Sequence, residues 1–301
     1  MKKNLLFIII FAIGLSSVHS QLRILEDAAR KAAEAAGIDE KTTNRLIKTA
    51  ATLEESRKAA DNLTPENEYY LGRAVAANIA GTYGIYKNPA LEAYLNKICS
   101  AIVINSPRPD IYNGYHVAIL DTNEINAFAT PGGHIFLTRG LIACAGNEDA
   151  LAAVIAHEVA HIQLRHALTS IRNARYANAF ISEAFAVTAD NVGGVKEFSA
   201  IMGDSVNDIV TTMVVKGFSP AQEKEADAAA LALLASAGYE PSGIIEMLEA
   251  IRQKQGNAKT GFGKTHPSPA ERITAVKKII GKHKVEDTRN FRTKRFSDIT
   301  R

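Results

Sequence analysis

The apolar run from Ala150 to Leu168 carries His157, Glu158 and His161 within about one helical turn, and this combination constrains the fold more than any other segment. Residues four apart lie on the same face of a helix, so the two imidazoles can reach one metal ion. Burying histidine and glutamate is costly unless they find a partner, and a metal ion is such a partner. The run therefore predicts a buried helix that binds a metal ion.

The same pattern, two histidines four apart with a glutamate after the first, is typical of zinc peptidases. Glu158 can face a metal-bound water and take its proton, whereas a purely structural site has no use for a general base. A lone buried histidine is often a satisfied core residue, but that alternative does not explain the intervening glutamate. Asn147 is expected to cap this helix, with Glu148 and Asp149 in its first turn.

A catalytic zinc site needs a third protein ligand and one open position. Ala167 stands ten positions after His157, where the metzincin pattern would place a histidine, and His166 falls one position short. Glu223 is the better candidate. It lies on a helix that Ser219 is expected to cap, with proline at the first helical position and glutamine completing a capping box.

Asp227 lies four residues after Glu223 and shares its helical face, so it can accept a hydrogen bond from a ligating imidazole while Glu223 binds the metal. Glu225 is expected to point elsewhere. Carboxylate pairs of this spacing are common on helix surfaces, so the upstream metal helix gives this pair its weight. We therefore predict His157, His161 and Glu223 as metal ligands, with Asp227 supporting an imidazole.

Short β segments are expected before the metal helix, beginning at residues 116–120. Residues 127–130 and 134–138 flank Pro131-Gly132-Gly133 and indicate a hairpin. Its edge can take a peptide as an added strand, which suits a protease of broad specificity; the alternative is a purely structural hairpin. Two helices are expected upstream, at about residues 65–79 and 89–105.

The first twenty residues have the features of a signal peptide: Lys2 and Lys3, the apolar stretch Leu5 to Leu15, and small residues up to Ser20. Eleven apolar residues are fewer than the roughly twenty that span a bilayer, which argues against the alternative of an uncleaved anchor. Cleavage after Ser20 predicts export, to the periplasm or beyond.

Removing Lys2 and Lys3 leaves 33 basic against 32 acidic residues, so charge makes no case for a nucleic-acid partner. Residues 283–301 are locally basic and are expected to form a solvated tail; binding to an acidic membrane surface or partner is the alternative. Residues 21–62 are expected to form a helical extension broken near Gly37. Cys99 and Cys144 can form one disulfide or remain buried thiols.

Five segments, in the same order along the chain, resemble the zinc metalloendopeptidase family that includes the CAAX prenyl proteases, HtpX and BepA. The matching segments are Leu63–Glu66 with Leu71–Arg73, Asn126–Gly133, His157–His161, Glu223–Asp227, and His266–Pro269 with Arg272. The resemblance covers about residues 63–282. It implies a gluzincin (zincin-like) peptidase domain of the α+β class, mainly α, with a small sheet beside the metal-binding helix and one zinc ion per chain.

The resemblance also implies roles for two further residues. Asn126 is expected near the backbone of a bound substrate. His266 is expected either to steady the oxyanion or to cap the zinc at rest, and the two poses can alternate. A purely structural role for His266, in the loop before a helix begun by Ser268, is the alternative.

Unlike the prenyl proteases and HtpX, the chain shows no transmembrane segments after the signal, which argues against prenylated substrates. It also shows no 34-residue repeat of the kind that BepA-type members carry. We therefore expect an exported zinc endopeptidase that hydrolyses unfolded or misassembled proteins in the periplasm or cell envelope. Residues 171–217 are expected to form a mobile lid. The alternatives are a mainly chaperone-like assembly factor that keeps a zinc site, and an aminopeptidase.

Overall fold

The computed structural model describes residues 64–170, 207–255 except 208, 265–300 except 284 and 287, and isolated positions between 27 and 47. The chain divides into two compact units, Met1–Leu63 with Arg172–Gly194, and Thr64–Ile171 with Val195–Arg301. The predicted signal peptide lies outside the described residues, as do most of the expected extension and lid. In the first unit, described positions on both sides of Gly37 are helical, and Gly37 has a φ of 70° that breaks the helix as expected.

The second unit contains a three-stranded mixed sheet of order β1-β3-β2. Strand β1 (His116–Leu120) is parallel to β3 (His134–Thr138), and β2 (Ala127–Ala129) is antiparallel to β3. The predicted hairpin is confirmed. Its turn, Pro131–Gly133, needs glycine at position 132, where φ is 73° and a Cβ atom would lie 2.5 Å from the Cα atom of Tyr69. Strand β2 forms one edge of the sheet.

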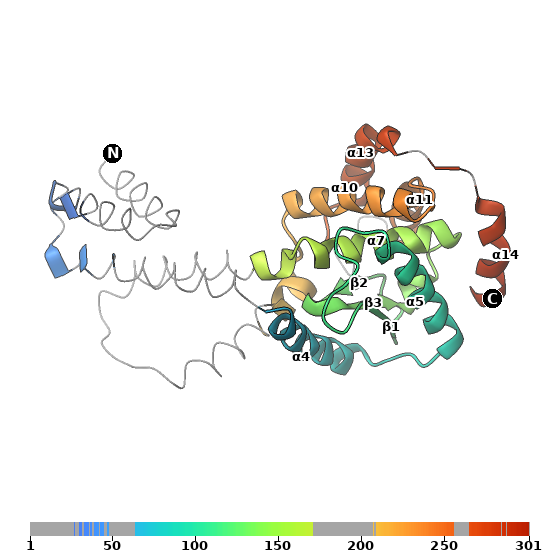
Figure 1. Cartoon of the computed structure of the whole chain (residues 1–301), viewed down its shortest axis with the longest axis horizontal. Coiled ribbons are helices and arrows are strands. Elements are labelled where there is room, and N and C mark those ends of the chain that lie inside the picture. The colour runs from blue at the N-terminus through green and yellow to red at the C-terminus, as the bar shows by residue number, and fades with distance from the viewer. Residues whose placement is uncertain are drawn as a thin grey trace. The chain divides into compact units, whose positions relative to one another are not determined.

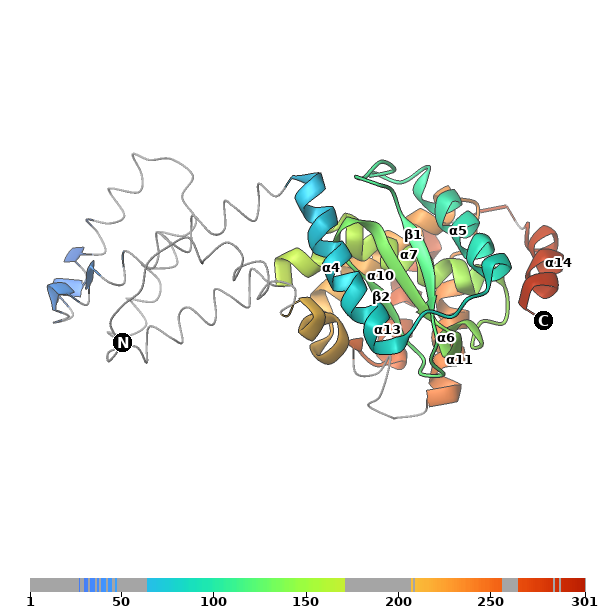
Figure 2. The same ribbon diagram turned by 90° about the horizontal axis from the view of Figure 1, so that it is seen from below.

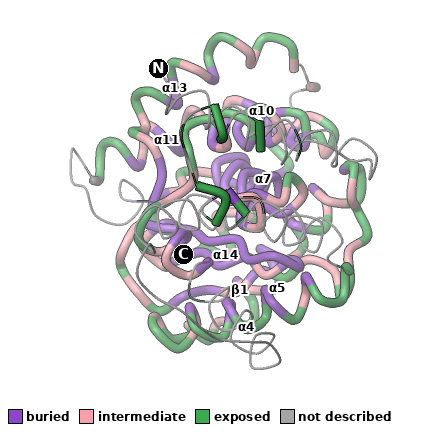
Figure 3. Tube along the Cα trace, turned by 90° about the vertical axis from the view of Figure 1, so that its left-hand side faces the viewer, coloured by how far each residue is buried: buried purple, intermediate pink, exposed green. Residues whose placement is uncertain are grey.

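Helix α7 (Glu148–Gln163) runs through the middle of this unit, and every residue from Glu148 to Ile162 is buried. Helices α10 (Pro220–Ser236) and α11 (Gly243–Gln255) pack on one side of α7, and β2 lies on the other (Figure 1). Figure 3 shows the purple, buried α7 enclosed by more exposed helices. The apolar run of the sequence is therefore the central element of the core.

The remaining elements surround this centre. They are α4 (Pro65–Tyr83), α5 (Pro89–Val103), α6 (Arg139–Ile142), the π-helix η2 (Thr211–Lys216), α13 (Pro269–Ile279), the 3₁₀ helix η3 (Ile280–Lys282) and α14 (Arg289–Thr300). Together they make the unit mainly helical with one small sheet, which confirms the predicted fold class at this level.

Polar caps set where these helices begin. Asn147 caps α7 by accepting a hydrogen bond from the Ala150 N–H, and Ser219 forms the predicted capping box with Gln222 on α10. Helix α4 continues to Tyr83, four residues beyond the expected end, because the chain leaves the helix only at Gly84, where φ is 74°. Local sequence signals thus located helix starts better than helix ends.

The basic tail is largely exposed, as a solvated tail would be, but it is helical and partly packed on the domain. Residues 289–300 form helix α14, which packs against α5 and α7 (Figures 1 and 2). Arg292 is buried and lies 2.9 Å from the Asp149 carboxylate, and Arg295 pairs with Glu148. Two of the basic residues therefore neutralise buried acids in the first turn of α7, because a carboxylate is buried cheaply only when it is paired.

Cys99 and Cys144 are buried free thiols, which decides between the two alternatives for them. Burial raises the pKa of Cys99 to about 12, so its thiol is protonated at neutral pH. Within the described part of the chain, no helix combines the length and the apolar character needed to cross a membrane.

Candidate active site

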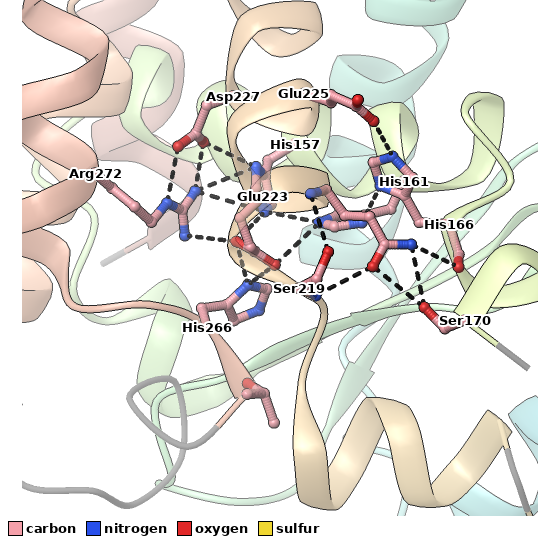
Figure 4. Close-up of polar contacts among 12 residues, drawn as sticks. His157, His161, His166, Ser170, Ser219, Glu223, Glu225, Asp227, His266 and Arg272 are labelled. Atoms are coloured by element: carbon pink, nitrogen blue, oxygen red, sulfur yellow. Dashed lines mark hydrogen bonds and ion pairs between the residues drawn. The ribbon is translucent and has the colours of Figure 1, made fainter. Parts of the chain in front are cut away.

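Four buried side chains converge between α7, α10 and the loop before α13 (Figure 4). One ligand atom from each of His157, His161, Glu223 and His266 lies within 4.8 Å of the others. The Nε2 atoms of His157 and His161 are 3.1 Å apart, and each lies 3.5 Å from an oxygen of Glu223. The three side chains expected as ligands are therefore together, although 62 residues separate His161 from Glu223.

Asp227 lies directly behind His157. Its Oδ1 atom is 3.0 Å from His157 Nδ1, so the ring nitrogen that faces away from Glu223 is held by a carboxylate. Arg272 donates to both oxygens of Asp227, at 2.6 and 3.0 Å. Burial opposes ionisation of Asp227, but Arg272 and His157 hold the pKa of this carboxyl below its usual range. Arg272 belongs to the last of the five resembling segments, and the sequence alone indicates no role for it.

His161 has different neighbours. Its Nδ1 atom lies 2.9 Å from His166 Nδ1, and the phenyl ring of Phe218 stacks on the imidazole with ring centroids 4.2 Å apart. His166 in turn has its Nε2 atom 3.3 Å from Glu225 Oε2. Burial lowers the pKa of His161 to about 3, which favours the neutral imidazole that binds metals.

The contact between His161 and His166 was not anticipated from the sequence, because residues five apart do not share a helical face. The structure brings them together by ending α7 at Gln163 and turning the chain at Arg165, where φ is 54°. A non-glycine residue with positive φ is uncommon, and no local sequence signal announces this one.

Glu158 lies next to the converging ligands and is buried. Among the residues that the structure describes, none forms a hydrogen bond with its Oε1 atom. Burial raises the pKa of Glu158, although the nearby His157 and His266 oppose the shift. Glu158 and His157 also line a cavity of about 20 Å³, which is large enough for about one water molecule.

His266 enters the site from the loop that precedes α13, and its Nδ1 atom lies 2.9 Å from both oxygens of Glu223. This loop is held from two sides. Thr265 donates a hydrogen bond to Asn126 Oδ1 at 3.1 Å. On the other side Gly217 approaches so closely that a Cβ atom there would lie 2.0 Å from the Thr265 carbonyl oxygen. Asn126 is itself buried and also accepts from the Ala127 N–H, so in this structure it anchors the His266 loop to β2.

The side chains present fit a divalent metal ion. Imidazole nitrogens and a carboxylate oxygen are the donors that zinc takes in proteins. Burial opposes ionisation of Glu223, but His266, His157 and His161 hold its pKa well below the usual range, so the site contains a buried negative charge surrounded by nitrogen donors. A buried glutamate with an unpartnered oxygen among the described residues stands beside it, where a bound water would need an acceptor.

A buried helix with two histidines and an adjacent glutamate, completed by a carboxylate from a second helix, defines the class of metallopeptidases. Residues 87–280 match the sequence profile of peptidase family M48. The chain therefore belongs to this family of metallopeptidases. The matched range contains all four residues of the convergent group.

Named relatives agree with this assignment. The chain is similar to the beta-barrel assembly-enhancing protease of Escherichia coli strain K12, with 25% identity over 223 residues that cover 71% of this chain and 44% of the relative. It is also similar to the mitochondrial metalloendopeptidase OMA1 of Schizosaccharomyces pombe, with 27% identity over 237 residues, 77% of this chain and 66% of the relative. The chain thus spans less than half of the bacterial relative and about two thirds of the yeast one.

Proposed function

We propose that this protein is an endopeptidase that binds one zinc ion per chain through His157, His161 and Glu223. The observation that carries the proposal is the convergence of their three ligand atoms beside the unpartnered oxygen of Glu158. When bound, zinc supplies Lewis-acid chemistry, because it lowers the pKa of a coordinated water and polarises a carbonyl group. Asp227 holds His157 in the orientation that such binding requires.

Glu158 is the proposed general base and then the general acid. Its Oε1 atom accepts the proton of the attacking water while the water oxygen bonds to the carbonyl carbon of the scissile peptide. Glu158 then passes this proton to the leaving amine nitrogen as the C–N bond breaks. Burial supports this role, since a carboxylate with a raised pKa is a better proton acceptor near neutral pH.

We propose that His266 can cap the zinc site at rest, which its place in the convergent group and the contact of its Nδ1 atom with Glu223 support. In a second pose, swung away from Glu223, the ring can donate a hydrogen bond to the oxyanion, as the resemblance implies. A peptide bound as an added strand along β2 would pass next to α7, which packs on this strand. The resemblance also implies that Asn126, at the start of β2, contacts the backbone of that peptide.

The proposed substrates are unfolded or misassembled proteins of the periplasm or cell envelope. This rests on the predicted signal peptide and on the similarity to beta-barrel assembly-enhancing proteases. The pose of His266 favours a second candidate, a mainly chaperone-like assembly factor with a zinc site, because a capped site has little basal activity. Removing the His266 imidazole distinguishes the endopeptidase from the chaperone-like factor.

The experiment combines metal analysis with cleavage assays. Wild type and His266→Ala are assayed for bound zinc, for cleavage of casein and for cleavage of a peptide blocked at both ends. The proposal predicts about one zinc per chain and internal cleavage of both substrates, faster in His266→Ala if the cap dominates. Zinc binding without cleavage by either protein would favour the chaperone-like role. Cleavage of peptides with free amino termini only would indicate an aminopeptidase.

A further inference from the structure

The two histidines proposed as zinc ligands have unequal support on their outer sides. His157 Nδ1 faces the buried carboxylate of Asp227, which is itself fixed by Arg272. His161 Nδ1 faces a second imidazole, His166, at 2.9 Å. Figure 4 shows that His166 lies beyond His161, away from Glu223 and toward Glu225. The inference that follows concerns this second branch, and it rests on the proposed function.

The positions of the protons in this branch follow from its chemistry. An imidazole that binds a metal through Nε2 carries its proton on Nδ1. His161 Nδ1 is therefore the donor in the 2.9 Å contact, and His166 Nδ1 must accept. A neutral imidazole has one donor and one acceptor, so the proton of His166 is on Nε2. That atom lies 3.3 Å from Glu225 Oε2, and a carboxylate can only accept.

We propose that His166 and Glu225 are positioning residues of the metal centre. The Glu225 carboxylate selects the His166 tautomer whose Nδ1 accepts a hydrogen bond, and His166 thereby orients the His161 ring with Nε2 toward the metal. Removing a residue that hydrogen-bonds to a metal ligand usually lowers metal affinity about 10- to 100-fold. Helix α10 then contributes three carboxylates to the metal centre: Glu223 binds the metal, Asp227 supports His157, and Glu225 supports His161 through His166.

The fold holds His166 in the place that this role needs. Its side chain is buried against the ring of Phe218, which also stacks on His161. Its carbonyl oxygen accepts a hydrogen bond from Gln222 Nε2 at 3.1 Å. Gln222 is the capping-box residue of α10, so the start of that helix is tied to the segment that carries His166.

The two branches differ in exposure. The Asp227 side chain is 4% exposed, whereas the Glu225 side chain is 66% exposed. A change at a surface carboxylate is therefore expected to reach the metal through His166. Surface charge changes elsewhere offer a matched control. Asp298 is 56% exposed and also forms an ion pair, with Lys294, but it lies on α14, a helix that carries no residue of the convergent group.

The test measures zinc and cobalt dissociation constants of the full-length protein by competition with a chromophoric chelator. We expect His166→Leu to weaken binding about 10- to 100-fold. We expect His166→Asn to stay within about threefold of wild type, because its amide oxygen can accept in place of Nδ1. Glu225→Lys should weaken binding about tenfold, since an ammonium group cannot accept from His166 Nε2, whereas Asp298→Lys, with the same charge change, should have no effect.

The visible absorption of the cobalt-loaded protein is a second readout, and it should change in His166→Leu and return toward wild type in His166→Asn. Equal weakening by leucine and asparagine would overturn the inference, because it would show that His166 only packs. If His166→Leu does not fold, equal affinity of Glu225→Lys and Asp298→Lys would overturn it. A wild type that binds metal and cleaves casein, with unchanged affinity in all variants, would refute this inference alone. A wild type without bound metal would refute the proposed function as well.

Discussion

Replacing Arg272 by methionine should strongly destabilise the protein, because it leaves the buried Asp227 carboxylate without its cation. Arg272 donates two hydrogen bonds to Asp227, at 2.6 and 3.0 Å, and the two side chains are only 6% and 4% exposed. Hydrogen bonds to charged groups contribute about 1.5–3 kcal/mol each. Breaking a buried ion pair from one side typically costs about 3–5 kcal/mol, and the two estimates agree.

The assay is urea and thermal unfolding of the metal-free protein followed by circular dichroism, so that loss of metal does not contribute. A cost of this size should lower Tm by about 6–20 °C. Arg252→Met is the matched control, because Arg252 pairs with Glu249 at 2.7 Å but is 54% exposed. Exposed pairs contribute at most about 1 kcal/mol. A free energy of unfolding of Arg272→Met within about 1 kcal/mol of that of Arg252→Met would refute this reasoning, because the buried pair would then contribute no more than an exposed one.

Two other predictions concern thiols and a close backbone approach. Cys99 and Cys144 should not react with a thiol reagent in the native protein and should both react after unfolding, because they are buried; rapid native labelling would contradict their burial. Gly217→Ala should destabilise the protein in the same urea melt, because φ at this position is 74° and the new Cβ would lie 2.0 Å from the Thr265 carbonyl oxygen. Gly81→Ala is the control: a Cβ there has no neighbour within 4 Å, so this variant should be neutral or stabilising. Equal changes in the free energy of unfolding for the two variants would contradict this prediction, because the loop that carries Thr265 would then move aside at no cost.

The parts of the site that could be predicted from sequence are those that depend on local chemistry. Helix α7 was predictable because its cap and the four-residue spacing of His157 and His161 act within one helix. The same holds for Glu223 and Asp227 on α10, where Ser219 begins the helix. The hairpin followed from its glycine-containing turn.

The parts that could not be predicted depend on contacts between distant segments. Nothing local to residues 289–300 shows that Arg292 reaches Asp149, which lies 143 residues earlier. The pairing of Arg272 with Asp227 requires α13 to pack beside α10. His166 reaches His161 only because the chain leaves the helix at Arg165 with a positive φ. Each of these contacts pairs a buried polar group, and the choice of partner is made by tertiary packing.

The role of Glu158 as the general base is tested most directly by comparing wild type with Glu158→Gln. Glutamine keeps the size of the side chain but cannot take up a proton at neutral pH. We predict that the variant binds one zinc per chain with wild-type affinity, while casein cleavage falls about 10²- to 10⁴-fold. Casein cleavage by Glu158→Gln at the wild-type rate would contradict the assignment of Glu158 as the base.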